Sequence, residues 1–263
     1  MERLLLIGLD APESQEIIRR AGVPATAWAV LPRVKLERGV LLVERTGAAG
    51  KFLPVSRVIY HGIFEDDFDT LTALALWGGP CLPSALGMMD CRQRIPGLAR
   101  ALRVTRFGGL ARSWAGPGST LDTGAHPSVA KWGNWHCGED KERFQGQRQC
   151  DVPTLAEDFV EGQAVRVMMI GERAWQIRLT GDGWKKSIHP DDAAFMPLDP
   201  ELLADTRNLS EHFQLEVIGN DYMIASDGSK YLLEVNHIPN VTRFEEIRSA
   251  YLDFASEWAR GGG

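Results

Sequence analysis

Short apolar segments alternate with stretches of helical periodicity over the first hundred residues of the chain. The apolar segments predict strands at residues 3–9, 27–31, 40–44 and 58–60, and the stretches between them predict helices near 14–21 and 69–76. Alternation of strands with helices is typical of a small α/β unit. The first segment, which contains LLLIGL, predicts a buried first strand.

The pattern changes twice farther along the chain. Residues 108–128 are rich in Gly, Pro and Ser and have no clear period, so we expect part of this span to be a linker or a mobile segment. Beyond residue 129 the pattern predicts long hairpins at 155–179 and 217–236, and helices at 200–212 and 244–259. The expected fold class is α+β.

Composition narrows the class of protein. The 263 residues carry a net charge of −6, which does not favour extensive binding of nucleic acid. No apolar run is long enough to cross a membrane, and residues 4–9 lack the basic flank and cleavage site of a signal peptide. The four cysteines form no C-x-x-C pair, which fits a reducing cytosol. We therefore expect a cytoplasmic protein with no nucleic-acid or membrane partner.

The segment YLLEVN, at the end of the last predicted hairpin, combines a strand pattern with oxygen ligands. Side chains alternate along a strand, so Glu234 and Asn236 point one way. Leu233 and Val235 are then expected to face the other way. An upstream Asp-Gly pair predicts a two-residue turn, which places Asp221 opposite Glu234. Three oxygen ligands on one surface predict a Mg²⁺ site for a phosphate-bearing substrate, the alternative being a solvated hairpin face.

The preceding hairpin carries arginines on mainly apolar strands. Its Gly-Glu-Arg turn leaves the register uncertain by one residue, with Arg178 opposite either Val165 or Arg166. In both registers we expect the two guanidiniums to lie near each other, which is repulsive unless an anion sits between them. The alternative is that each faces water separately. Lys185 and Lys186 add cations just beyond this hairpin.

A loop that begins with a lysine precedes both hairpins. Lys131 ends an apolar approach, and Gly133 and Gly138 flank a turn whose backbone amides could approach phosphate oxygens. The G-x-x-x-x-G-K-[ST] spacing of a P-loop is absent. Taken alone, this cluster has an ordinary surface loop as its alternative interpretation.

These elements follow one another in a distinctive order. The chain presents a lysine strand with its loop, an E-D-F-V segment, an arginine hairpin, a W-K-K turn, an aspartate and E-V-N. That order resembles the ATP-grasp superfamily, closely over residues 90–245. It looks nearest to synapsin C domains and to the glutathione-synthetase-like, ribosomal-protein glutamate ligases. The synapsin loop is similar to the K-x-G-x-x-H-x-G-x-x-K pattern of Lys131, Gly133, His136, Gly138 and Lys141.

The resemblance implies an ATP-grasp fold that holds a nucleotide between two sheets. It implies a pre-ATP-grasp subdomain at 1–100 and an ATP-grasp domain at 101–263, with a lid at about 108–160 and a C-terminal sheet at about 161–263. The residues implied to bind ATP are Arg92, Lys131, Gly133, His136, Gly138, Lys141, Glu157, Asp158, Phe159, Val160 and Glu161. The implied catalytic cations are Arg166, Arg178, Lys185 and Lys186, and the implied Mg²⁺ ligands are Asp221, Glu234 and Asn236.

Three positions depart from the family pattern. Ala164 stands where many relatives place an acid that binds ribose, so Glu161 or another acid must serve. Cys91 sits where an Asp commonly precedes the basic residue, here Arg92. Residues 237–240 replace a glycine-rich segment, which puts the usual contacts with the acyl acceptor in doubt.

The resemblance also implies an activity. Such enzymes typically phosphorylate a carboxylate with ATP and then let an amine or thiol attack the acyl phosphate. The implied protein is an ADP-forming carboxylate-amine ligase whose substrate is a small molecule, an amino acid or a peptide. The alternatives are a synapsin-like module that binds ATP with little turnover and a small-molecule kinase of the same fold. The full set of arginines and metal ligands favours the ligase, and the oligomeric state, a homodimer included, is left open.

Overall fold

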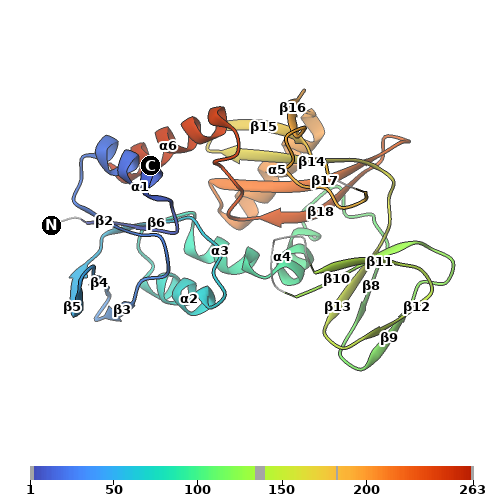
Figure 1. The fold of residues 1–263 in the computed structure, drawn as a ribbon, viewed down its shortest axis with the longest axis horizontal. Coiled ribbons are helices and arrows are strands. Elements are labelled where there is room, and N and C mark those ends of the chain that lie inside the picture. The colour runs from blue at the N-terminus through green and yellow to red at the C-terminus, as the bar shows by residue number, and fades with distance from the viewer. Residues whose placement is uncertain (1–2, 134–139, 182, 262–263) are drawn as a thin grey trace.

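The N-terminal unit is built on a parallel sheet (Figure 1). The computed structural model describes residues 3–133, 140–181 and 183–261. In sheet order the strands are β2 (Ala25–Trp28), β1 (Leu4–Ile7), β6 (Arg57–Tyr60) and β7 (Cys81–Leu82). Every residue of β1 is at most 1 % exposed, as expected for a parallel strand covered on both faces. The predicted buried first strand is confirmed.

Helices and a small antiparallel sheet complete this unit. The helices are α1 (Ala11–Ala21), α2 (Asp67–Trp77) and α3 (Ala85–Arg92), and the small sheet contains β3 (Val34–Glu37), β4 (Val40–Arg45) and β5 (Ala48–Pro54). The next helix, α4 (Arg94–Ala101), packs its buried residues into a core shared with the C-terminal part of the chain. Helix α1 has a proline in its first turn and ends at Gly22 with φ 65°, a left-handed conformation that glycine adopts without strain. Among the described residues, no helix has the length and apolarity needed to span a membrane.

The middle of the chain forms a separate antiparallel layer. Its main sheet has the order β11 (Lys141–Phe144), β10 (Ser128–Trp132), β13 (Thr154–Asp158) and β8 (Arg112–Ala115). A second pair joins β9 (Ser119–Asp122) to β12 (Gln147–Cys150). The expectation of a linker within residues 108–128 is therefore wrong, because β8, β9 and the first residue of β10 lie inside this span and pair with strands from beyond residue 140.

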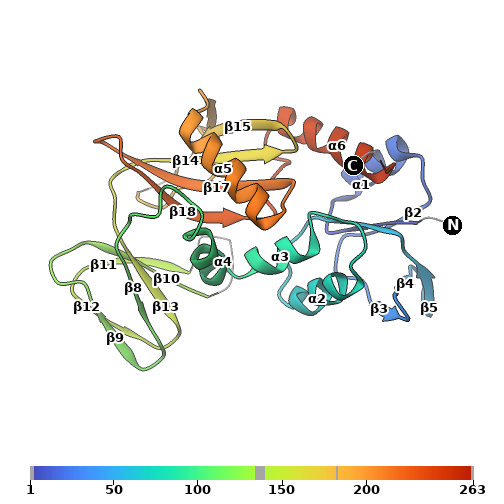
Figure 2. The same cartoon turned by 180° about the vertical axis from the view of Figure 1, so that it is seen from behind.

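The C-terminal part is a five-stranded antiparallel sheet with helices on both sides. In order the strands are β16 (Ala194–Met196), β15 (Arg173–Arg178), β14 (Gly162–Ile170), β17 (Val217–Ala225) and β18 (Lys230–Asn236). Helix α5 (Pro200–Phe213) crosses one face of the sheet, as Figure 2 shows. Helix α6 (Glu245–Ala259) lies beside α1, and its apolar residues share a core with the other face.

The hairpin of β17 and β18 has the predicted pairing of Asp221 with Glu234, but its turn differs from the predicted one. Its loop has three residues rather than two, because the amide of Ala225 donates to the carbonyl of Ser229 at 2.8 Å. This shifts the register by one residue, and an irregularity next to Asp221 shifts it back. Asp221 therefore does pair with Glu234. The extra residue is Leu233, which lines a cavity on the same side as Glu234, so the expectation that it faces the opposite side is wrong.

The hairpin of β14 and β15 has a two-residue turn, which pairs Val165 with Arg178 and Arg166 with Ile177. Because neighbouring positions of a strand alternate between faces, Arg178 lies on the face opposite to Arg166. Consistent with this, Val165 packs into the core beneath α5, whereas Ile177 packs into the core shared with α6. The expectation that the two guanidiniums lie near each other on one surface is therefore wrong.

Candidate active site

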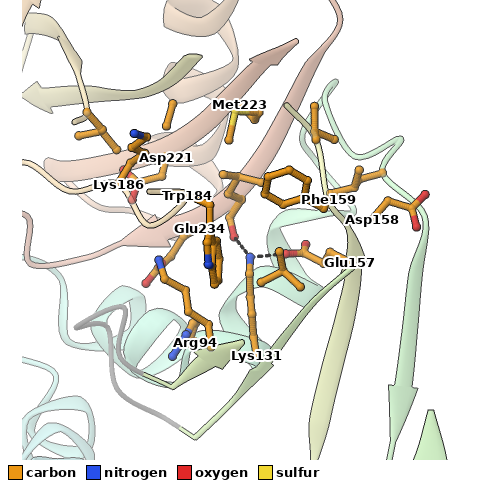
Figure 3. Close-up of a pocket in the computed structure, with 17 residues that line it drawn as sticks. Arg94, Lys131, Glu157, Asp158, Phe159, Trp184, Lys186, Asp221, Met223 and Glu234 are labelled. Carbon is orange, nitrogen blue, oxygen red and sulfur yellow. Dashed lines mark hydrogen bonds and ion pairs between the residues drawn. The ribbon is translucent and has the colours of Figure 1, made fainter. Parts of the chain in front are cut away.

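Two adjoining cavities open between the middle layer and the C-terminal sheet. The first cavity has a volume of about 110 Å³ and the second about 420 Å³. Both are lined by Lys141, Leu179, Lys186, Asp221 and Glu234. Figure 3 shows the first cavity, with Asp221 and Glu234 from β17 and β18, Lys186 beside Asp221, Lys131 from the middle layer and Arg94 from α4.

The first cavity has an apolar end. Its apolar lining comes from three sources: β10 and β13 with their flanking residues, strands β14, β17 and β18, and the residues that follow β15. These residues are Leu110, Val129, Phe159, Val160, Ala164, Leu179, Trp184, Met223 and Leu233. The rings of Phe159 and Trp184 meet edge to face, with centroids 6.4 Å apart. An apolar slot of this kind, bordered by the chain at Asp158 and Phe159, suits a flat heteroaromatic group whose polar edge meets backbone atoms.

A buried carboxylate of the middle layer holds the two cations that reach the C-terminal sheet. Glu157, which is 2 % exposed, forms ion pairs with Lys131 and with Arg112, the latter at 2.8 Å. The Lys131 ammonium also donates to the carbonyl of Leu233 at 3.3 Å, and the Arg112 guanidinium donates to the carbonyl of Leu232 at 3.0 Å. Lys131 is thus oriented by groups from both layers, and its cation faces the cavity.

Further cations crowd the region where the two cavities meet. Burial lowers the pKa of the Lys141 ammonium, and the charge of nearby Lys131 lowers it further, against the opposing effect of Glu234. The Lys186 ammonium donates to the carbonyl of Gly181 at 2.9 Å and lines both cavities. Concentrated positive charge with few fixed partners attracts an anion, and a phosphate chain fits this requirement.

The acidic side chains form the opposite wall. Arg166 binds Asp221 through two parallel contacts, Nε to Oδ1 at 2.6 Å and Nη2 to Oδ2 at 2.8 Å. Burial by itself lowers the pKa of the Arg166 guanidinium, but Asp221 more than compensates and the pKa lies above its ordinary value. Glu234 stands directly opposite Asp221 on the next strand, and Asn236 lines the second cavity while its amide donates to the carbonyl of Gly219 at 3.2 Å.

No protein-family model matches the sequence, and a comparison with curated proteins finds no match. Solved structures match over nearly the whole chain. An ATP-grasp ligase associated with RiPPs from Chryseobacterium gregarium, in complex with ADP and a leader and core peptide, has a TM-score of 0.67 at 13 % identity and covers 100 % of this chain and 98 % of its own. D-alanyl-alanine synthetase A from Vibrio cholerae has a TM-score of 0.63 at 12 % identity, with 99 % and 98 % covered.

A third match is a RimK domain protein of the ATP-grasp type from Sphaerobacter thermophilus, with a TM-score of 0.65 at 13 % identity and coverage of 97 % of this chain and 99 % of that one. This chain has the ATP-grasp fold. The middle layer falls within residues 108–160, the range for which the resemblance implies a lid, and the two cavities open between it and the C-terminal sheet.

Most of the residues predicted to bind ligands in this ATP-grasp chain come together around the two cavities. The first cavity is lined by Lys131, Lys141, Glu157, Asp158, Phe159, Val160, Lys186, Asp221 and Glu234. The second cavity adds Arg166 and Asn236. His136 and Gly138 lie outside the described residues.

Other predicted residues are placed elsewhere. Arg178 and Lys185 line neither cavity: Arg178 donates to the carbonyl of Asp192 at 3.4 Å, and Lys185 is exposed beside the Trp184 ring. Glu161 is exposed outside the first cavity, and Gly133 lines a separate apolar cavity. For Arg178 the reason is the turn length of its hairpin, which places it on the opposite face of the sheet.

The Arg92 side chain is buried in the N-terminal unit and lines neither of the two cavities. It is 5 % exposed, its Nε contacts Oδ1 of the fully buried Asp67 at 2.5 Å, and its Nη2 donates to the carbonyl of Phe64 at 2.6 Å. The residue that reaches the first cavity is Arg94, the first residue of α4. Arg92 is the last residue of α3 and Arg94 is the first residue of the next helix. Because the backbone changes direction between the two helices, the two side chains point in different directions.

Sequence reasoning also overlooked Arg112 and His189. Arg112 ties the ATP-grasp lid to β18, and its partners are carbonyl groups and Glu157. His189 lines the second cavity. The sequence carries no clear signal for either, because their importance depends on contacts with segments far away in the chain.

Proposed function

We propose that this protein is an ATP-dependent ligase that joins a carboxylate to an amine through an acyl phosphate and releases ADP and phosphate. The observation that carries the proposal is the shared boundary of the two cavities. An apolar slot that suits a purine meets a roomier polar cavity at a cluster of cations and carboxylates. A structure with this fold, the ATP-grasp ligase PsnB, was solved with a minimal precursor, Mg and ADP.

In this proposal the purine of ATP occupies the first cavity. The backbone of Asp158, Phe159 and Val160 meets its polar edge, while Met223 and Leu233 cover its face. The phosphates then extend toward Lys131, Arg94, Lys141 and Lys186. Asp158 lines the first cavity with an exposed carboxylate, whereas Glu157 is bound by Lys131 and Arg112 and Glu161 lies outside the cavity, so we assign ribose recognition to Asp158.

The residues on β17 and β18 fit Mg²⁺. Hard divalent cations prefer oxygen ligands, and Mg²⁺ is usually held by one or two carboxylates together with substrate phosphates. Asp221, Glu234 and Asn236 supply two carboxylates and an amide oxygen on neighbouring strands, although Asp221 shares its oxygens with Arg166. When bound, Mg²⁺ neutralises charge on the β- and γ-phosphates. The protein residues then orient the γ-phosphate toward the second cavity.

The second cavity places the reacting carboxylate. A carboxylate oxygen attacks the γ-phosphorus, the bond from that phosphorus to the ADP oxygen breaks, and an acyl phosphate forms. Arg166 and Lys186 lie beside the transferred group and stabilise its charge. An amine then attacks the acyl carbon, the carbon–oxygen bond to phosphate breaks, and the amine loses a proton. Apolar walls formed by Ile188 and Ile238 help to exclude water from the acyl phosphate.

The lining of the second cavity favours a residue within a peptide over a free amino acid. Among its described residues, the carboxylates are Asp221 and Glu234, which the phosphates and metal engage. The lining also includes Ile63, Ile238 and Asn240, which offer no charge to bind a free α-ammonium or α-carboxylate. A peptide side chain has neither group beside it. Solved structures of this fold were determined with precursor peptides, which supports the same substrate class.

The proposed function is tested by trapping the acyl phosphate with hydroxylamine. The protein with ATP and Mg²⁺ is supplied with free glutamate and aspartate, or with the same residues blocked as N-acetyl amides and inside short peptides. We expect ADP release and a hydroxamate, detected by mass, with blocked or peptide substrates ahead of the free amino acids. A stable phosphorylated alcohol without hydroxamate would indicate a kinase. Tight ATP binding without ADP release from any substrate would indicate a regulatory module.

Replacing Arg94 with glutamine is expected to weaken ATP binding without unfolding the protein. The Arg94 Nε is buried without a hydrogen-bond partner in the described part of the chain, and Nη2 reaches the carbonyl of Trp132 only at 3.4 Å. The guanidinium therefore has donors left for a phosphate. Charged hydrogen bonds contribute about 1.5–3 kcal/mol, so Kd for ATP should rise by roughly 10- to 100-fold, measured by calorimetry.

A matched control is Arg100→Gln, which removes an arginine of the same helix that pairs with Asp90 at the surface. Its Kd should remain near that of the unmodified protein. An unchanged Kd in Arg94→Gln would remove Arg94 from the phosphate site.

A further inference from the structure

One wall of the second cavity is a segment without regular secondary structure between β15 and β16. Residues 183–193 supply Lys186, Ser187, Ile188 and His189 to this wall. The facing wall is the chain that leaves β18, with Asn236, Ile238 and Asn240. The width of the cavity therefore depends on how the 183–193 segment is held against the chain that follows β18.

The base of this segment is fastened to β15. Thr180 and Ser187 exchange backbone hydrogen bonds of 3.0 and 2.7 Å. At the other end, the Thr180 hydroxyl donates to the Asp192 carboxylate at 2.6 Å, and Arg178 donates to the Asp192 carbonyl at 3.4 Å. These contacts fix the two ends of the wall. Between them lie the carbonyls of Ile188 and Pro190, of which the Pro190 carbonyl also accepts from the amide of Ala193 at 3.0 Å.

Arg243 binds the middle of the segment from the opposite wall. Its Nε donates to the carbonyl of Ile188 at 3.3 Å, and its Nη2 donates to the carbonyl of Pro190 at 3.2 Å. The same Nη2 lies 3.6 Å from the carboxylate of Asp191. Arg243 itself stands three residues beyond Asn240, on the chain that forms the facing wall. One planar guanidinium therefore joins the two walls of the cavity at a point outside it.

We propose that Arg243 is a positioning residue that sets the width of the second cavity and thereby places the acceptor substrate and Lys186. This inference rests on the proposed function, because it assigns the second cavity to the acceptor. The guanidinium lines neither of the two cavities. It acts through the backbone of the 183–193 segment, and only a side chain with several donors in a fixed plane satisfies both carbonyls and the carboxylate.

Loss of this contact should affect the acceptor more than the nucleotide. The first cavity takes most of its lining from the lid and from β17 and β18, which Arg243 does not touch. The second cavity takes four of its residues from the segment that Arg243 holds. A displacement of about 1 Å at a reacting group costs on the order of 100-fold in rate, so loosening the wall should raise KM for the acceptor and lower kcat.

The test compares Arg243→Gln, Arg243→Lys and the control Arg248→Gln. Arg248 is matched closely, since it is an arginine paired with Glu13 at 2.8 Å and its side chain is 28 % exposed, against 29 % for Arg243. Three quantities are measured: hydrogen exchange of peptides covering residues 183–193, Kd for ATP, and steady-state KM and kcat with a blocked acidic acceptor and hydroxylamine.

In Arg243→Gln, we expect amide exchange in the 183–193 segment to be at least 10-fold faster, because a lost pair of charged hydrogen bonds is worth roughly 1.5 kcal/mol or more. Acceptor KM should rise about 10-fold or more, while Kd for ATP rises by a clearly smaller factor, because the segment supplies two residues, Trp184 and Lys186, to the first cavity. Arg243→Lys, which can keep one carbonyl contact, should be intermediate, and Arg248→Gln should match the unmodified protein in all three measurements.

Unchanged exchange in Arg243→Gln would overturn the proposal, as would equal effects in Arg248→Gln. An equal loss of ATP affinity and acceptor affinity would overturn it too, because that pattern indicates general loosening. The exchange measurement needs no substrate. If exchange rises only in the Arg243 variants but no carboxylate is ever activated, the proposed function fails while the structural coupling stands.

Discussion

Replacing Glu234 with glutamine is expected to lower Mg²⁺-dependent release of ADP by three or more orders of magnitude. Glu234 lines both cavities and pairs with Asp221 across the hairpin, so it stands where the proposed metal and the transferred phosphate would meet. Glutamine keeps the shape of the side chain but removes the charge that holds the cation. Removing a group that stabilises transition-state charge typically costs about 10²–10³ in rate, and loss of metal occupancy adds to this.

The measurement is ADP release with Mg²⁺ varied at saturating acceptor, beside circular dichroism to check folding. Glu211→Gln serves as a control, because Glu211 is an exposed residue of α5 on the far side of the sheet. Excess Mg²⁺ should restore part of the activity if the substitution only weakens the binding of the metal. Full turnover in Glu234→Gln would exclude the assignment of Glu234 as a metal ligand.

Replacing Arg92 with leucine is expected to destabilise the N-terminal unit by about 3–5 kcal/mol without a direct effect on the nucleotide. The physical reason is Asp67, which has no exposed surface and contacts Arg92 Nε at 2.5 Å. Removing the guanidinium leaves a carboxylate buried with the weaker donors of Tyr60 and the Phe64 amide. Urea unfolding should show a lower midpoint, and ATP binding at low temperature should be preserved.

The matching surface change is Arg100→Leu, which breaks the pair with Asp90. The Arg100 side chain is 51 % exposed, and pairs of this kind contribute at most about 1 kcal/mol. The double variant Arg92→Leu, Asp67→Asn should recover part of the lost stability, because the buried charge is gone. A loss of ATP affinity with unchanged unfolding in Arg92→Leu would instead support the nucleotide role that the sequence suggested for Arg92.

The pairing of Asp221 with Glu234 shows how local signals work and where they stop. The Asp-Gly turn and the alternation of E-V-N predicted the correct partners. The turn nevertheless has an extra residue, and a compensating irregularity in β18 restores the pairing. That irregularity turns Leu233 into the cavity, and its carbonyl accepts from Lys131. No sequence pattern predicts this irregularity, because a bulge is stabilised by the partner strand and by the middle layer.

For Arg178 the prediction from the sequence was wrong. One residue in the turn decides which face of the sheet its side chain occupies, and both turn lengths suit the sequence. The two-residue turn places Arg178 away from Arg166, and its guanidinium helps to fasten the 183–193 segment at Asp192. The hairpin that carries the two arginines was predicted correctly from the sequence. Which face of the sheet the Arg178 side chain occupies depends on the strand register, and the complete sheet determines that register.

The sequence by itself determined the order of the elements, the strand and helix types, and the identities of most residues around the cavities. These follow from short-range periodicity, from turn chemistry and from the order of motifs along one chain. Only the tertiary structure decided that Arg94 rather than Arg92 reaches the first cavity and that Arg112 and Lys131, both paired with Glu157, tie the middle layer to β18. It also decided that Arg243 holds the 183–193 segment. The physical reason is distance along the chain: these contacts join residues that lie 25 to 120 positions apart, and their geometry exists only after all the layers have packed.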